Sequence, residues 1–117
     1  IKVIGVLGAG QMGGGIAQVA AQSGYSVLLA DASKELAEKG KGRIVKGLEK
    51  LVEKGKITAD VKDGIAARIT PVDGIAGFAP ADLVIEAATE NVELKTKLFR
   101  QIDEVLRPGA YLATNTS

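Results

Sequence analysis

One stretch near the start of the chain, GVLGAGQMGGGIAQVAA, constrains the fold more than any other. Its residues Gly8, Gly10 and Gly13 form the pattern G-x-G-x-x-G where a short apolar run gives way to a helical pattern. The first glycine permits a tight turn, the second lets the backbone approach a pyrophosphate, and the third lets the helix pack closely on the strand. The stretch therefore predicts a strand–turn–helix unit whose first helical N–H groups, near Gln11 and Met12, face the phosphates of a dinucleotide.

An acidic residue at the end of the next apolar run supports this interpretation. Residues 27–30 read as a second buried strand, and Asp31 follows them at the separation that the fingerprint requires. A carboxylate there accepts hydrogen bonds from both ribose hydroxyls and repels a 2′-phosphate, so the cofactor is predicted to be NAD rather than NADP. Two alternatives stay open at this point: FAD or another adenine nucleotide, and a tight corner beside a solvated aspartate.

Strand and helix patterns alternate along the whole chain. The predicted strands are residues 2–7, 27–30, 68–72, 83–88 and 110–114, and the predicted helices are residues 11–23, a long helix capped by Ser33, a short one from Thr58 to about Arg68, and one capped by Asn91. The apolar positions of the long helix are Leu36, Ile44, Leu48, Leu51 and Val52, and residues 73–82 are expected to form a connection. This order predicts a single domain over residues 1–117, a doubly wound parallel α/β sheet of the Rossmann type with a helical hairpin after the second strand.

Composition excludes several classes of function. A net charge of +1 and 3% aromatic residues argue against nucleic-acid binding. No apolar run is long enough to span a bilayer, so no membrane association is expected. Cysteine is absent, which fits a reducing compartment, and we expect a cytoplasmic protein with no metal site.

A second group of charged residues follows the fourth predicted strand. Glu86, Glu90 and Lys95 fall near the carboxyl end of that strand, where ligands bind in a doubly wound sheet. The lysine would neutralise phosphate or reach a ribose, and Glu90 would hold either a ribose or the lysine. Plain charge at a helix end explains the same spacing equally well.

Together, the segments GVLGAGQMGGGIAQVAAQSGYSVLLAD, LVIEAATENVELKTKLF and LATNTS resemble a known family over all 117 residues. The chain is similar to the N-terminal NAD-binding domain of 3-hydroxyacyl-CoA dehydrogenases, including the bacterial 3-hydroxybutyryl-CoA enzymes. The resemblance implies reversible oxidation of an (S)-3-hydroxyacyl-CoA to the 3-ketoacyl-CoA, with hydride transfer to NAD, in fatty-acid or butanoate metabolism.

The resemblance also implies roles for single residues. It assigns residues 8–13 to the pyrophosphate, Asp31 to the adenosine ribose, and Glu90 and Lys95 to NAD. The Ser117 hydroxyl would contact the acyl-CoA substrate beside the nicotinamide. The predicted cofactor site therefore comprises Gly8, Ala9, Gly10, Gln11, Met12, Gly13, Asp31, Glu90, Lys95, Asn115 and Ser117.

Coenzyme A is predicted to contact the long helix. Lys54 falls on a lysine position that the family uses for this purpose, whereas Gly47 replaces a serine that contacts coenzyme A in some relatives. Lys50 belongs to a cationic stripe on the same helical face that would suit phosphates, made of Lys39, Arg43, Lys46, Lys50 and Lys54. The alternative is a solvated face with acid–base pairs.

The sequence contains no histidine, the residue that the family uses, paired with glutamate, as the base for the hydroxyl proton. We therefore expect these 117 residues to bind cofactor without catalysis, and both ends of the sequence to be cuts in a longer chain. The resemblance implies a helical C-terminal domain, absent here, through which the full protein forms a homodimer. Two other functions are weighed: a stand-alone NAD-sensing module and a hydroxyacid dehydrogenase of the 6-phosphogluconate type.

Overall fold

The computed structural model of the protein describes residues 1–87 and 92–114. Its centre is a five-stranded sheet in the order β3-β2-β1-β4-β5, and every neighbouring pair is parallel. The strands are β1 (Val3–Leu7), β2 (Ser26–Ala30), β3 (Ile69–Pro71), β4 (Leu83–Glu86) and β5 (Tyr111–Thr114). The chain thus moves outward from β1 in one direction and then returns to build β4 and β5 on the other side. This is the doubly wound topology that the sequence predicts.

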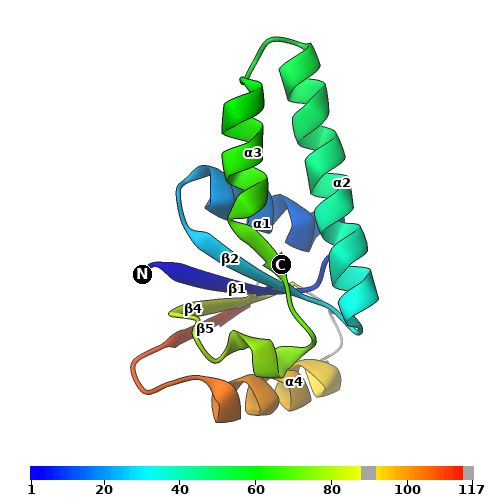
Figure 1. The fold of residues 1–117 in the computed structure, drawn as a ribbon. Helices are drawn as coiled ribbons and strands as arrows, with labels where there is room; N and C mark the ends of the chain where they lie inside the picture. Colours follow the sequence, from blue (N-terminus) through cyan, green and yellow to red (C-terminus); the bar gives the residue numbers. More distant parts are fainter. Residues whose placement is uncertain (88–91, 115–117) are drawn as a thin grey trace.

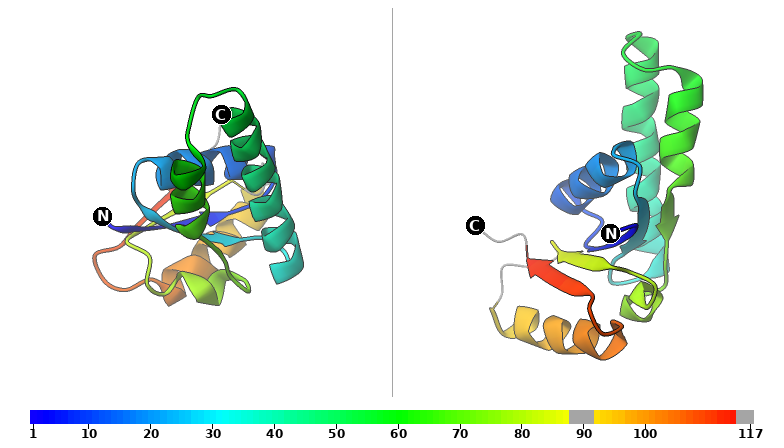
Figure 2. Two further views of the ribbon diagram at one scale, coloured as in Figure 1. Left: turned by 45° about the horizontal axis from the view of Figure 1, so that its top comes forward. Right: turned by 90° about the vertical axis from the view of Figure 1, so that its left-hand side faces the viewer.

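Helices cover both faces of this sheet. The helical elements are α1 (Gln11–Gln22), α2 (Lys34–Glu53), α3 (Ala59–Ala67), the 3₁₀ turn η1 (Ile75–Phe78) and α4 (Val92–Val105). The right-hand view of Figure 2 shows α1, α2 and α3 on one face and α4 on the other. In Figure 1, α2 and α3 run antiparallel and project beyond the sheet, which confirms the predicted helical hairpin.

Two predicted caps begin the helices of this hairpin. The Ser33 hydroxyl accepts a hydrogen bond from Leu36 N at 3.2 Å, and the Thr58 hydroxyl accepts one from Val61 N at 3.2 Å. Each satisfies a backbone donor that the first helical turn leaves without a partner. The predicted cap at Asn91 lies outside the described residues.

The buried face of α2 includes Ile44 and Leu48, as their spacing indicates, but it differs from the sequence pattern at Leu36. Leu36 is 43% exposed, and the residues that face inward are Ala37, Gly40, Ile44 and Leu48. The reason is a close approach at Gly40, where an added Cβ would lie 2.5 Å from Ala9 Cβ. Because α2 presents Gly40 to the loop after β1, its buried face is rotated away from Leu36.

The core consists of two apolar clusters, one on each face of the sheet. The first packs the inner side of α1 and the α2–α3 hairpin on the sheet through residues such as Leu29, Leu48 and Ile65. The second includes Phe78, Val84 and Ile102 under η1 and α4. Phe78 is fully buried although it belongs to the segment predicted as a mere connection. That segment therefore fills the second cluster.

Within the described residues, no helix has both the length and the apolar character needed to cross a membrane. The longest, α2, is 20 residues long and carries many charged side chains.

Candidate functional site

The loop after β1 has the backbone geometry that its glycines predict. Gly8 has a φ of 111°, a left-handed conformation that favours glycine, and its N–H donates to Ala30 O at 2.8 Å. A Cβ added at Gly13 would lie 1.6 Å from the carbonyl oxygen of Gly8. Helix α1 therefore begins in direct backbone contact with the end of β1, as the sequence predicts.

Gly10 differs from these two glycines because no contact within residues 1–87 and 92–114 requires a glycine there. Its φ of −69° is open to any residue, and an added Cβ would meet no atom within 4 Å. Gly10 is the N-cap of α1, with no side-chain cap and no acidic residue in the first turn. The side chains that follow, Gln11 and Met12, are exposed. The first turn of α1 is thus open to an approaching anion.

Asp31 lies against this loop. Its Oδ2 accepts a hydrogen bond from Ala9 N at 2.8 Å, and its Oδ1 accepts one from Ala32 N at 2.6 Å. A carboxylate has about four acceptor positions, so each oxygen can accept a further hydrogen bond. The structure therefore brings Asp31 and the glycine loop together at the carboxyl ends of β1 and β2.

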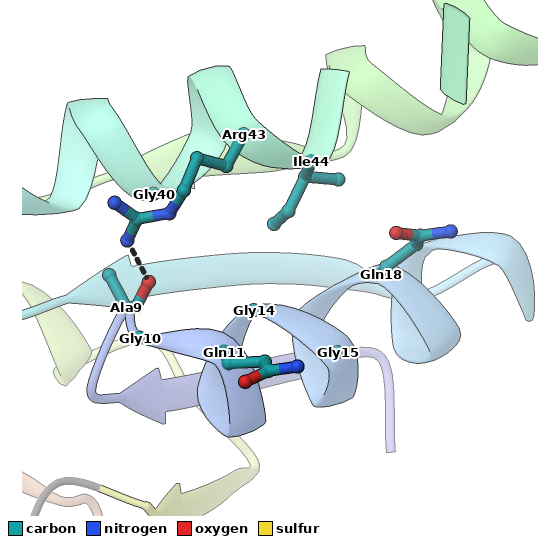
Figure 3. Close-up of a pocket in the computed structure, with 9 residues that line it drawn as sticks. All are labelled: Ala9, Gly10, Gln11, Gly14, Gly15, Gln18, Gly40, Arg43 and Ile44. Carbon is teal, nitrogen blue, oxygen red and sulfur yellow. Dashed lines mark hydrogen bonds between the residues drawn. The ribbon is translucent and has the colours of Figure 1, made fainter. Parts of the chain in front are cut away.

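Ala9 is 1% exposed, and both of its backbone polar groups have hydrogen-bond partners. Its N–H donates to Asp31, and its carbonyl oxygen accepts a hydrogen bond from Arg43 Nη2 at 2.7 Å. Figure 3 shows the guanidinium reaching over Gly40 to this carbonyl. Ala9, predicted as a cofactor-binding residue, holds the shape of the loop through its backbone.

A cavity of about 430 Å³ lies between the start of α1 and the middle of α2. Its lining includes the backbone of the glycine loop, the amides of Gln11 and Gln18, and Arg43. The sequence did not predict Arg43 as a residue of this cavity, because its spacing placed it in the cationic stripe of the long helix. Gly40 was the available signal, since residues three apart share a helix face and a glycine marks close approach.

The other members of the cationic stripe do not reach this cavity. Lys39 pairs with Glu35 at 3.6 Å, and Lys50 and Lys54 are exposed near the end of α2. Lys54 is roughly 16 Å along the helix axis from Arg43, at 1.5 Å per residue. The residues predicted to hold coenzyme A therefore lie on the projecting hairpin, away from the glycine loop (Figure 1).

Three polar side chains meet at the carboxyl ends of β4 and β5. Thr114 Oγ1 donates to Glu86 Oε1 at 3.1 Å and accepts from Lys95 Nζ at 3.1 Å. Lys95 Nζ also lies 3.4 Å from Glu86 Oε1. We refer to these residues as the Glu86–Lys95–Thr114 triangle. Its acid is Glu86, which the sequence places near the cofactor cleft together with Lys95; Thr114 was not among the predicted site residues.

The triangle is adjacent to the glycine loop. Glu86 pairs in register with Leu7 on one side and with Thr114 on the other, and Leu7 directly precedes Gly8. The strand order reverses between β1 and β4, which is where ligands bind in such sheets. The predicted site residues Glu90, Asn115 and Ser117 lie outside the described residues.

The model of the family "3-hydroxyacyl-CoA dehydrogenase, NAD binding domain" matches residues 3–117. The chain belongs to this family. As a 3-hydroxyacyl-CoA dehydrogenase NAD-binding domain, it has NAD as its cofactor. The match favours this family over the two alternatives weighed from the sequence.

Two curated relatives illustrate the similarity. The chain is 50% identical over 113 residues to a probable 3-hydroxybutyryl-CoA dehydrogenase of Deinococcus radiodurans, covering 97% of this chain and 40% of that protein. It is 44% identical over 117 residues to a 3-hydroxyadipyl-CoA dehydrogenase of Escherichia coli, covering all of this chain and 25% of that protein. The chain therefore spans less than half of the length of either relative.

A solved structure shares the fold. The crystal structure of (S)-3-hydroxybutyryl-CoA dehydrogenase from Ralstonia eutropha superposes with a TM-score of 0.96 at 39% identity. The match covers all of this chain and 41% of that one.

Proposed function

We propose that this chain is the cofactor-binding part of an enzyme that oxidises (S)-3-hydroxyacyl-CoA to 3-ketoacyl-CoA. The family match and the relatives named above support the class of reaction. NAD, when bound, supplies the hydride acceptor. The 117 residues bind and orient it.

The contact between Asp31 and the glycine loop carries this proposal. Because Asp31 Oδ2 accepts from Ala9 N at 2.8 Å, the carboxylate is held beside the turn that leads into α1. A dinucleotide whose pyrophosphate meets the first turn of α1 would place its adenosine ribose at this carboxylate. The unobstructed space at Gly10 supports the same placement.

The remaining assignments complete the proposed division of roles. Lys95 contacts NAD from the β4 side, and Asn115 and Ser117 act beside the nicotinamide, with the Ser117 hydroxyl oriented toward the substrate. Lys50 and Lys54 contribute to the coenzyme A contact. The acyl-CoA substrate, dimerisation through a further helical domain and a cytoplasmic location belong to the proposed full-length enzyme.

The 117 residues contain no histidine, so they lack the side chain best suited to act as the base in this oxidation. Removal of the hydroxyl proton needs a base whose pKa lies near the working pH, which histidine provides most readily. We therefore expect this chain to bind NADH but not to oxidise 3-hydroxybutyryl-CoA.

The test is a comparison of NADH and NADPH affinities. The chain should bind NADH at least about tenfold more tightly, because the Asp31 carboxylate accepts from ribose hydroxyls and repels a 2′-phosphate. Asp31→Ala should weaken NADH binding by a similar factor and reduce the preference between the two nucleotides. Asp103→Ala, which removes an exposed carboxylate from α4, is the control. Equal affinity of the unaltered chain for NADH and NADPH would contradict the role of Asp31.

A further inference from the structure

The Glu86–Lys95–Thr114 triangle contains a carboxylate with no exposure to solvent. Glu86 is 0% exposed, and it is the one charged residue in the buried part of the described chain. The Lys95 side chain is only 11% exposed. Removing both charges from water is costly, and buried ion pairs of this kind contribute little to net stability compared with apolar packing. The position of the pair, next to the glycine loop, points instead to a role at the cofactor.

The hydrogen bonds of the triangle determine what Lys95 has left to offer. A lysine ammonium has three N–H donors and no acceptor. Among the described residues, two acceptors take up two of these donors: Thr114 Oγ1 at 3.1 Å and Glu86 Oε1 at 3.4 Å. One oriented N–H remains. The carboxylate also compensates the positive charge of the ammonium, so this donor suits a neutral acceptor better than a phosphate.

We propose that Glu86 is a positioning residue that, with Thr114, holds Lys95 so that its remaining N–H donates to a ribose hydroxyl of NAD. This inference rests on the proposed function, which makes Lys95 a cofactor contact. Glu86 acts through Lys95 and does not itself touch the cofactor. The register supports the geometry, because Glu86 lies between Leu7 of β1 and Thr114 of β5 at the carboxyl ends of the strands.

The network also ties three elements together at the cofactor edge of the sheet. Glu86 ends β4, Thr114 ends β5, and Lys95 lies in the first turns of α4. Thr114 both donates to the carboxylate and accepts from the ammonium, so its hydroxyl has one defined orientation. Loss of Glu86 or Thr114 leaves the Lys95 side chain less constrained. NADH binding must then order this long side chain, and that cost weakens the affinity.

A double-mutant cycle on the 117-residue chain tests this inference. The variants are Glu86→Gln, Lys95→Met and the two combined, and the measurement is NADH affinity from the change in NADH fluorescence. The chain has no tryptophan, so no energy transfer from tryptophan to NADH contributes to the signal. Each single substitution should weaken NADH binding about tenfold, the effect of one charge-assisted hydrogen bond. The double variant should bind no more than about twofold more weakly than Lys95→Met, because both changes remove the same contact.

Melting temperatures and three further variants keep the test informative if a single substitution impairs folding. Lys95→Met leaves a buried carboxylate without its ammonium, so its melting temperature should fall, and the double variant should recover it. Thr114→Val removes the hydroxyl without disturbing either charge and should weaken NADH binding several-fold. Lys97→Met and Glu104→Gln make the same chemical changes at exposed positions of α4 and serve as matched controls.

The outcomes separate the inference from the proposed function. If Lys95→Met weakens binding but Glu86→Gln does not, Glu86 does not position the lysine, and the cofactor role of Lys95 stands. Additive losses in the double variant would show that Glu86 acts independently of Lys95 and would also overturn the inference. If Lys95→Met binds NADH as the unaltered chain does, the lysine is no cofactor contact and the inference fails with it. An unaltered chain that does not bind NADH would overturn the proposed function itself.

Discussion

At the scale of single residues, the glycine loop depends on the close approach of Gly13 to the backbone of Gly8, which leaves no room for a side chain at position 13. A Cβ at Gly13 would lie 1.6 Å from a backbone oxygen of Gly8, which cannot move without displacing the end of β1. We expect Gly13→Ala to lower the free energy of unfolding by about 3 kcal/mol or more, as overpacking against backbone does. Urea denaturation followed by circular dichroism measures the change. NADH affinity should fall as well, because the first turn of α1 shifts.

Gly15 provides the matched control in the same helix. An added Cβ there meets nothing within 4 Å, and the residue is exposed. Gly15→Ala should therefore raise the free energy of unfolding by about 0.5–1 kcal/mol, the difference in helix propensity between glycine and alanine. Equal effects of the two substitutions would contradict the contact between Gly13 and Gly8.

At the scale of elements, the position of α2 depends on its approach to the glycine loop. A Cβ at Gly40 would lie 2.5 Å from Ala9 Cβ and 2.9 Å from Ala9 O, whereas one at Gly42 would meet nothing. Gly40→Ala should lower the free energy of unfolding by about 1–3 kcal/mol, and Gly42→Ala should raise it by about 0.5–1 kcal/mol. The same urea titration distinguishes them. Stabilisation by both substitutions would mean that α2 is free to move away from Ala9.

The elements themselves could be predicted from local signals. Apolar runs placed the strands to within a few residues, and the hydroxyls of Ser33 and Thr58 predicted the starts of α2 and α3 correctly. The burial of Ile44 and Leu48 followed from their spacing, but the exposure of Leu36 and the inward position of Gly40 could not be predicted, because leucine is more hydrophobic than glycine. Only the tertiary contact with Ala9 shows why the glycine faces inward. The 3₁₀ turn η1 was missed because Gly74, Gly77 and Pro80 gave its surroundings the composition of a loop and concealed the buried Phe78.

The parts of the candidate site that lie directly at the ends of strands could be predicted from the sequence. Strand order brings the glycine loop and Asp31 together, so a correct topology was sufficient to place them. The partners of Lys95 and the bond from Arg43 to Ala9 are side-chain contacts between residues far apart in sequence. No spacing rule in one sequence identifies such contacts. Roles assigned by resemblance to Glu90, Asn115 and Ser117 stay predictions.

At the scale of the whole molecule, the polar groups at the amino ends of the strands and those at the carboxyl ends have different partners. At the amino ends of the strands, Asp82 accepts hydrogen bonds from Lys2 N and Val3 N, at 2.7 and 2.9 Å, and pairs with Arg107. At the carboxyl ends, Gly10 and the first turn of α1 have no side-chain cap, and Asp31 retains acceptor capacity. Asp82 thus finds its partners within the chain. At the carboxyl ends, the first turn of α1 and Asp31 can therefore still form hydrogen bonds with a ligand.

NADH bound at the carboxyl ends of the strands should stabilise the folded chain. A ligand that binds only the folded state at a hundred times its dissociation constant adds about 2.7 kcal/mol to the free energy of unfolding. For a domain of this size, that corresponds to a rise in melting temperature of about 10 °C. Thermal denaturation with NADH should show this rise, and NADPH at the same concentration should produce a clearly smaller one because of the Asp31 carboxylate. Gly13→Ala should abolish both shifts, whereas Gly42→Ala should raise the melting temperature and leave the NADH shift unchanged. Equal shifts with NADH and NADPH would mean that Asp31 does not meet the ribose.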